Sequence, residues 1–267
     1  MEDPANNNQA ALVNFVIAGT QKGGTSALDA YLRTHQDVTM ASFSEDSLVF
    51  DDAKNEVHFF DDDRLFNGEV EYTSYHALFN VNENTVVGEA TPSYMYWAGT
   101  AERIYQYNPQ MKFIILLRNP IERAYSHWNM EKNRGNDKSS SFRAALKQEM
   151  DLYKRGFAEQ HFVYSFMDRG FYTEQLKRIW RYFPKEQTLI LKSDDLKNNV
   201  NTSLHQVADF LGISSFPTLE SKQIHSGSYT SKINQDDFNY LKDKFYYEIK
   251  DLERLLEWDC SDWIAEI

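Results

Sequence analysis

The chain has 267 residues, of which 42% are hydrophobic and 15% aromatic, enough to fill a sizeable folded core. Its formal net charge is −12, so we do not expect nucleic acid or another extended polyanion as its main partner. The single cysteine, Cys260, rules out an internal disulfide and a multi-cysteine metal site and favours a reducing compartment.

The sequence shows no signal for a membrane or for export. It contains no run of 18 apolar residues, and its first 14 residues include acidic and polar residues where a signal peptide would have a basic stretch and an apolar core. We therefore expect a cytoplasmic protein with no membrane partner. Residues 1–11 are expected to form a flexible tail and residues 12–267 a single domain. The oligomeric state is left open.

Apolar runs alternate with helical patterns along the chain. The run 12–20 predicts a strand buried on both faces, and residues 25–35 follow as a helix. The run 111–118 precedes a helix in which Pro120 suits the first turn. A third run, 186–196, precedes a helix that ends at Gly212, and a long amphipathic helix begins near residue 236. This alternation predicts an α/β, P-loop-like fold of three layers, with a central parallel sheet flanked by helices.

The loop after the first strand reads GTQKGGTS. Glycines let backbone amides approach an anion, and the N-terminus of the following helix adds a favourable dipole. In a nucleotide-hydrolase loop the lysine follows the last glycine, whereas here Lys22 precedes Gly23 and Gly24. With hydroxyl donors from Thr25 and Ser26, the loop suits a phosphate-like group without requiring a metal. The alternative is a structural turn before a capped helix.

A second candidate anion site follows the run 111–118. Arg118 ends that strand, and Ser126 lies on a later turn of the next helix, so a guanidinium and a hydroxyl can converge on a further phosphate. Taken alone, Arg118 could equally pair with an acidic neighbour and Ser126 could be solvated. The presence of two such loops, each between a strand and a helix, favours anion binding.

In this order the two loops, "GTQKGGTSALDAYLRTH" and "LRNPIERAYSHW", resemble the two signatures of sulfotransferases that use 3′-phosphoadenosine-5′-phosphosulfate (PAPS). The matches "EVHFF" at 56–60, "GEATPSYMYW" at 88–97 and "RGFYTEQLKRIWRYFP" at 169–184 extend the resemblance over most of the chain. The branch it most resembles contains the heparan sulfate sulfotransferases and their soluble bacterial relatives. The resemblance implies PAPS as the donor, 3′-phosphoadenosine-5′-phosphate (PAP) as the product, and no metal requirement.

The same resemblance assigns donor-binding roles. The first loop would hold the 5′-phosphosulfate, with Lys22 stabilising the charge on the leaving phosphate, and the second loop would hold the 3′-phosphate. A tyrosine at the start of "YTEQ" and a late loop would add nucleotide contacts. The residues expected to bind the donor are Lys22, Gly23, Gly24, Thr25, Ser26, Arg118, Ser126, Tyr172, Ser228, Tyr229 and Lys232.

The acceptor needs a base to remove its proton. Glu56 in "EVHFFD" matches the glutamate that serves as the base in the heparan sulfate 3-O-sulfotransferases, and His58 and Asp61 match as well. A carboxylate within hydrogen-bond reach of the acceptor can take this proton. The resemblance therefore assigns the base to Glu56. His58 supports Glu56, acts as the base itself, or packs beside its phenylalanine neighbours.

One departure concerns the acceptor. Ala90 stands where many relatives have a lysine near the sulfuryl group or the acceptor, and its presence, like the acidity of the chain, argues against a polysaccharide. Glu89 is either a second acceptor-site carboxylate or a buried acid in a hydrogen-bond network. Relatives vary their acceptor-covering elements at 136–166. The candidate acceptor contacts, several of which would also suit a core, are Asp61, Glu89, Tyr94, Trp97 and Trp128.

The function predicted from these features is in-line transfer of a sulfuryl group from PAPS to a hydroxyl or amine of a small-molecule acceptor. A neutral or cationic secondary metabolite of a bacterial pathway would suit the acidic, aromatic-rich chain. A carbohydrate O-sulfotransferase is one alternative. A P-loop kinase-type phosphotransferase is another, and it would need magnesium and a nucleoside triphosphate.

Overall fold

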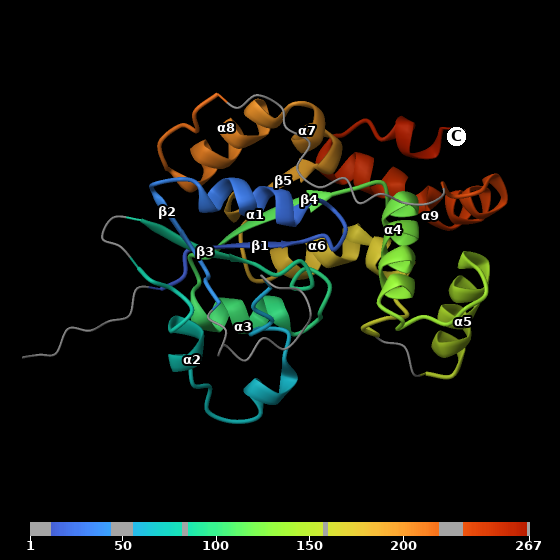
Figure 1. Cartoon of the computed structure of the whole chain (residues 1–267), viewed down its shortest axis with the longest axis horizontal. Helices are drawn as coiled ribbons and strands as arrows, with labels where there is room; N and C mark the ends of the chain where they lie inside the picture. Colours follow the sequence, from blue (N-terminus) through green and yellow to red (C-terminus); the bar gives the residue numbers. More distant parts are fainter. Residues whose placement is uncertain (1–11, 44–55, 82–84, 157–159, 219–231, 266–267) are drawn as a thin grey trace, which may run out of the picture.

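The computed structural model describes residues 12–43, 56–81, 85–156, 160–218 and 232–265 (Figure 1). Within them, a five-stranded sheet has the order β2-β3-β1-β4-β5, and all of its neighbouring strands are parallel. Parallel pairing requires a long crossover between successive strands, and helices supply these crossovers here. The strands are β1 (Phe15–Gly19), β2 (Val38–Met40), β3 (Val86–Ala90), β4 (Lys112–Leu117) and β5 (Thr188–Lys192).

The central strand β1 explains why the sheet is covered on both faces. All five of its residues are buried, as expected for an apolar strand inside a parallel sheet. Because side chains alternate along a strand, Phe15 and Ile17 enter one hydrophobic cluster, whereas Val16 and Ala18 enter another. The sheet therefore separates two cores.

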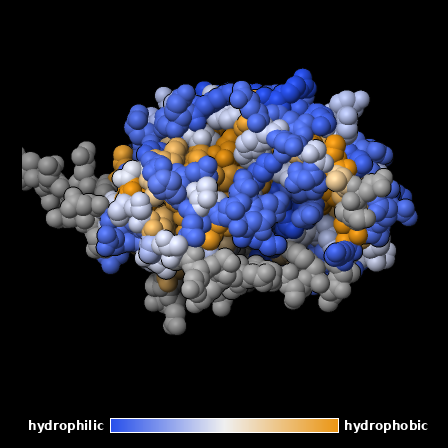
Figure 2. All heavy atoms as spheres, turned by 90° about the horizontal axis from the view of Figure 1, so that it is seen from above, coloured by the Kyte–Doolittle hydropathy of each residue, from blue (hydrophilic) through white to orange (hydrophobic). Residues whose placement is uncertain are grey.

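Three helices cover the first face (Figure 1). They are α1 (Thr25–Arg33), α7 (Ser193–Asn198) and α8 (Val200–Leu211). Leu28 of α1 and Leu204 of α8 are fully buried in the cluster that contains Ile17. Seen from this side, the molecular surface is mainly hydrophilic, with smaller hydrophobic areas (Figure 2).

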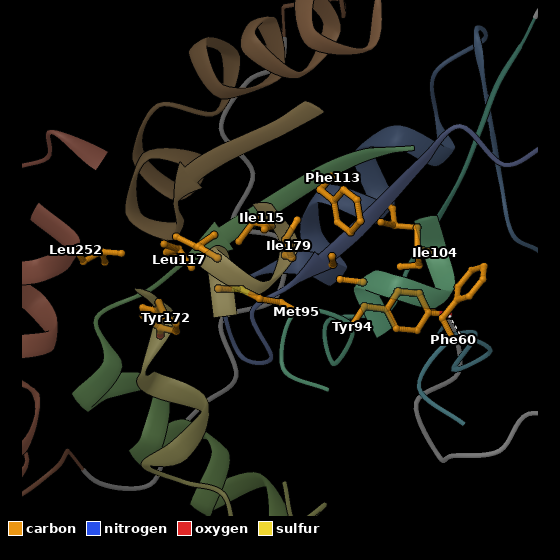
Figure 3. Packing of buried hydrophobic residues seen from close by; sticks show 14 of the residues in the cluster. Phe60, Tyr94, Met95, Ile104, Phe113, Ile115, Leu117, Tyr172, Ile179 and Leu252 are labelled. Atoms are coloured by element: carbon orange, nitrogen blue, oxygen red, sulfur yellow. Dashed lines mark hydrogen bonds between the residues drawn. The ribbon is translucent and has the colours of Figure 1, made fainter. Parts of the chain in front are cut away.

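The second face carries the larger core. Figure 3 shows Phe113, Ile115 and Leu117 of β4 in this core, together with Ile179 of α6 and Ile104 of α3. The helices that contribute to this side and to the end of the sheet are α2 (Thr73–His76), α3 (Thr100–Tyr107), α4 (Pro120–Asn133), α5 (Phe142–Lys154), α6 (Tyr172–Trp180) and α9 (Gln235–Leu256). Short 3-10 turns are η1 (Asp63–Phe66), η2 (Asp168–Gly170), η3 (Lys185–Gln187) and η4 (Ser261–Ile264).

The structure confirms the predicted α/β fold with its central parallel sheet between helical layers. Pro120 begins α4, and Gly212 ends α8 in a left-handed conformation with φ 76°. The short strand β2 and the strand β3 were not predicted as strands. Residues 1–11 lie outside the described residues, and a single domain over 12–267 stays a prediction.

No helix in the described part of the chain is both long enough and apolar enough to cross a membrane.

Candidate active site

The loop after β1 is fixed at its base and open at its top. The Thr20 amide donates to the Leu116 carbonyl at 2.8 Å, and the Gly23 amide donates to the Thr20 carbonyl at 2.8 Å. Lys22 and Gly24 adopt left-handed backbone conformations, with φ 70° and 96°. Helix α1 then begins without a side-chain cap. The amides of Ala27 and Leu28 donate to the Gly24 carbonyl, and the helix N-terminus formed by Thr25 and Ser26 suits an anion.

The two loop glycines have different tasks. A Cβ on Gly23 would lie 2.6 Å from the Leu116 carbonyl oxygen and 2.8 Å from that of Thr20, so a larger residue would push the loop off β4. A Cβ on Gly24 would meet no atom within 4 Å, so this side of the loop is open. Ser193, the first residue of α7 after β5, anchors the loop by donating to the Gly23 carbonyl at 2.5 Å. Such a cradle fits a phosphate-like group.

The second candidate anion loop contacts the first. Arg118 follows β4, and its Nη1 donates to the Lys22 carbonyl at 3.4 Å. Its Nε and Nη2 donate to Glu122 at 3.2 and 2.8 Å, so the pairing with an acidic neighbour that the sequence left open is present. The buried Tyr172 donates to the Arg118 carbonyl at 2.8 Å, which fixes this loop from the side of α6.

The remaining donor-site candidates lie on or near α4. Ser126 is buried on this helix, at 1% exposure. The exposed Lys232 lies alongside, because its carbonyl accepts a hydrogen bond from Tyr125 at 3.4 Å. Ser228 and Tyr229 lie outside the described residues. The structure thus brings Lys22, Arg118 and Tyr172 together at the carboxyl ends of β1 and β4, where ligands bind in parallel sheets.

A cavity of about 410 Å³ adjoins the first loop. Gln21, the neighbour of Lys22, forms part of its wall, and so do Glu56, His58 and Asp61. The segment 136–166, expected to cover the acceptor, contributes Asn136, Phe162 and Val163. The cavity therefore extends from the anion loop to the predicted base Glu56 and its neighbours His58 and Asp61.

His58 lies between two carboxylates. Its Nδ1 is 2.9 Å from Asp61 Oδ2, and its Nε2 is 3.0 Å from Glu56 Oε2. Ser93 also donates to Asp61. Burial acts to lower the pKa of His58, but the hydrogen bonds with Asp61 and Glu56 outweigh it and raise that pKa to about 10. A histidine protonated at neutral pH cannot accept a proton there, so the geometry favours Glu56 as the base.

The segment that carries these residues is linked to the buried Glu89 through the hydroxyl groups of Thr91 and Tyr94. The backbone amides of residues 57 and 58 donate to Thr91 Oγ1, and those of 59 and 60 donate to the Tyr94 hydroxyl, at 3.0 to 3.4 Å. Thr91 and Tyr94 in turn donate to Glu89, at 2.6 and 3.0 Å. Figure 3 shows the link between Tyr94 and Phe60. Glu89 is fully buried, and burial raises its pKa to about 7 although these hydroxyls lower it.

The other acceptor candidates are only partly brought together. Trp97 packs against Phe162 of the cavity wall, with 5.4 Å between the ring centroids. Trp128 donates to Asp137 at 2.9 Å and packs on Phe142, at 5.3 Å, outside the wall of this cavity. Ala90, in the position of the relatives' lysine, is buried in the cluster on the α1 face of the sheet.

Sequence reasoning missed several contributors. Ser193 carries no motif signal, whereas Ser93 and Arg169 lie within matched segments without having been singled out, and the contacts of Ser193 and Ser93 join residues distant in the sequence. Arg169 lies in the "RGFY" match, which could have drawn attention to it. Gln21 was not singled out either. It belongs to the first loop, and it also forms part of the cavity wall.

Comparison with known proteins identifies the family. Residues 13–250 match the family model described as the sulfotransferase domain. The chain belongs to the sulfotransferase family. This confirms the family inferred from the two loops, and its members are enzymes.

Curated relatives and solved structures match most of this chain. Human heparan sulfate glucosamine 3-O-sulfotransferase 5 is 28% identical over 202 residues, which are 76% of this chain and 54% of the relative. The chain thus spans about half the length of the curated relatives it matches first. A sulfotransferase from Alicyclobacillus acidocaldarius is 26% identical, with a TM-score of 0.77 over 96% of this chain and 100% of that chain. The sulfotransferase domain from the curacin biosynthetic pathway, 15% identical with a TM-score of 0.51 over 93% of this chain and 98% of that chain, shares the fold.

Proposed function

We propose that the chain transfers the sulfuryl group of PAPS to a hydroxyl or amine of a small-molecule acceptor. The observation that carries this proposal is the shared cavity, because one space is lined by Gln21 of the anion loop and by Glu56 and His58. A transferring group held at the loop and an acceptor beside the carboxylate would meet there. The proposal includes the cytoplasmic location expected from the sequence, which the buried, free Cys260 fits.

The loop residues would bind the donor. The open side of Gly24, the first-turn amides of α1 and the charge of Lys22 suit a phosphosulfate, and Arg118 suits the 3′-phosphate. When bound, PAPS supplies an activated sulfuryl group. Lys22 would neutralise the charge that develops on the leaving phosphate oxygen.

The acceptor side is built for proton removal. Glu56 is 24% exposed as a side chain, so an acceptor can reach it, whereas His58 behind it is 9% exposed. The imidazolium of His58 would orient the Glu56 carboxylate, while Asp61 holds the other ring nitrogen. Positioning of this kind contributes most of the catalysis in sulfuryl and phosphoryl transfer, since little covalent chemistry falls to the protein.

The cavity suits a small acceptor. Its volume of about 410 Å³ falls in the range of roughly 300–1,000 Å³ that is typical of small-molecule sites. The wall holds both carboxylates and arginines, and two of the arginines pair with carboxylates, so it suits a compact polar compound better than an anionic polymer. A glycan is the alternative acceptor, and the similarity to a human enzyme named for heparan sulfate favours it.

An acceptor screen tests the proposal. The purified protein would be incubated with PAPS and either hydroxylated and amine-bearing small molecules or a desulfated heparan-type oligosaccharide, and PAP release and product mass would be measured. We expect acceptor-dependent PAP release with small molecules, and its near-complete loss in Lys22→Ala that remains folded. Sulfation of the oligosaccharide alone would establish the glycan alternative. Consumption of ATP with magnesium, but not of PAPS, would contradict both.

A further inference from the structure

Arg169 is a buried cation in the cavity wall. It belongs to η2 and is only 2% exposed. Its Nε donates to Ser165 Oγ at 2.9 Å, its Nη2 contacts the Phe162 carbonyl at 3.5 Å, and its guanidinium lies 4.3 Å from the centre of the Tyr96 ring. Among the described residues, no hydrogen-bond partner is present for its buried Nη1. The side chain is therefore held in one place with part of its bonding capacity unused.

Arg169 differs from the other arginines of the cavity. Arg64 pairs with Asp62 at 2.7 Å, and Arg134 pairs with Glu131 at 3.5 Å. Within the described part of the chain, no carboxylate forms an ion pair with Arg169. The charges of Asp61, Glu56 and Glu131, in the same wall, act on Arg169 without a direct ion pair, so an anion that enters the cavity would form a closer contact with it than they do.

A second buried arginine and a buried carboxylate lie near Arg169. Arg123 is fully buried nearby, and its Nε and Nη1 lack partners among the described residues. The neighbouring carboxylate of Glu149 accepts from the amides of residues 167 and 168. Burial and the charges of Arg123, Arg169 and Lys22 lower the pKa of His127 well below its usual range. The charges of Arg169 and of Lys22 in the anion loop therefore both act on the same buried histidine.

We propose that Arg169 binds an oxygen of the donor's sulfuryl group and acts with Lys22 on the group in transfer. The inference rests on the proposed function. It follows from the position of Arg169 in the same wall as Gln21, the neighbour of Lys22, and Glu56. A group that passes from the anion loop to an acceptor beside Glu56 would cross this space.

The chemistry calls for such a cation. In the transfer, the bond between sulfur and the 5′-phosphate oxygen breaks, and its electron pair stays on that oxygen. The acceptor oxygen or nitrogen forms a bond to sulfur, and its proton passes to Glu56. Charge is spread over the other sulfuryl oxygens meanwhile, and a fixed, always protonated guanidinium stabilises it without reorganising.

Calorimetric titration with PAPS and with PAP, without an acceptor, tests the inference. PAP lacks the sulfuryl group, so its affinity reports the nucleotide contacts alone. We expect Arg169→Gln to weaken PAPS binding by about tenfold and PAP binding by less than about twofold, as for the loss of one charge-assisted hydrogen bond. Arg169→Lys keeps the charge but cannot reproduce the fork of donors, so we expect a PAPS-selective loss of about threefold.

Two controls make the result decisive. Arg181→Gln removes an exposed arginine that follows α6 and pairs with Glu174 of that helix. The affinities for PAPS and for PAP should both stay at the wild-type values. Circular dichroism shows whether each variant folds, and Arg169→Lys decides the matter if the glutamine variant does not. Equal losses for PAPS and PAP, or no loss, would overturn the role of Arg169. Steady-state kinetics would give a third result: if the KM for the acceptor rises while the ratio of PAPS affinity to PAP affinity stays at the wild-type value, Arg169 contacts the acceptor, and the inference is overturned. Failure of the wild-type protein to prefer PAP over ADP would instead refute the proposed function.

Discussion

Glu56 and His58 are joined through their side chains, with Glu56 Oε2 lying 3.0 Å from His58 Nε2. His58 itself has a left-handed backbone conformation, with φ 53°. Asp61 holds the opposite nitrogen of the ring. This arrangement fixes a charged histidine between two acids and leaves Glu56 as the member with the greatest access to the cavity.

Glu56→Gln tests the assignment of the base. The change keeps the shape of the side chain but removes its ability to take a proton, so we expect kcat to fall by about 10²- to 10⁴-fold while PAP affinity is unchanged. Steady-state kinetics and calorimetry measure the two effects. Glu174→Gln, an exposed glutamate on α6, serves as the control and should retain full activity. Near-normal turnover in Glu56→Gln would assign the base elsewhere.

The raised pKa of His58 predicts a pH-dependent contribution to stability. Because the folded-state pKa is about 10, above the ordinary value of 6.5, this contribution is complete below pH 6.5 and is lost as the pH rises toward 10. Thermal unfolding of the wild-type protein and of His58→Gln should therefore show a difference in Tm that shrinks over this range. A difference that widens with pH would show that His58 is not held as the cation.

Tyr94 and Tyr75 allow a matched comparison of two hydroxyl groups in the hydrogen-bond network around Glu89. Each donates a hydroxyl to Glu89 Oε1, but only Tyr94 also accepts the amides of residues 59 and 60. We expect Tyr94→Phe and Tyr75→Phe each to destabilise the fold by about 1–3 kcal/mol. Only Tyr94→Phe should also lower kcat, because it releases the segment that carries His58. Denaturant unfolding and kinetics would separate the effects, and equal kcat values in the two variants would argue against positioning by Tyr94.

Much of the fold can be predicted from the sequence, whereas the left-handed backbone conformations of individual residues cannot. Apolar runs bounded by Gly and Pro predicted β1, β4 and the helices after them, since local patterns determine these elements. The strand β2 has three residues and β3 contains Gly88 and Glu89, so neither has a distinctive pattern. The conformations of Lys22 and His58 depend on surrounding packing.

The same distinction holds for the candidate site. The two loops and "EVHFFD" could be found because their residues are adjacent in sequence. The anchoring of Gly23 by Ser193 spans 170 residues, and the contact between Tyr172 and the Arg118 carbonyl spans 54. Contacts of this kind are set by tertiary structure.

The pair of Arg118 and Glu122 predicts a competition with the nucleotide. Glu122 is 54% exposed as a side chain and accepts from Arg118 Nη2 at 2.8 Å, so a 3′-phosphate bound by Arg118 would have to displace it. Glu122→Gln removes the competing charge, and we expect PAP to bind about two- to fivefold more tightly at low salt, with a smaller gain at high salt. Glu102→Gln on α3 is the control for lost negative charge. Weaker PAP binding in Glu122→Gln would mean that Glu122 orients Arg118 instead of competing for it.

The most direct measurement is a calorimetric titration of the wild-type protein with PAP, ADP and AMP in the absence of metal. If Arg118 and Ser126 hold a 3′-phosphate beside the first loop, PAP should bind about tenfold to a hundredfold more tightly than ADP, since charge-assisted hydrogen bonds are lost with that phosphate. Equal affinity for PAP and ADP, or binding that needs magnesium, would contradict the assignment of the two loops to PAPS.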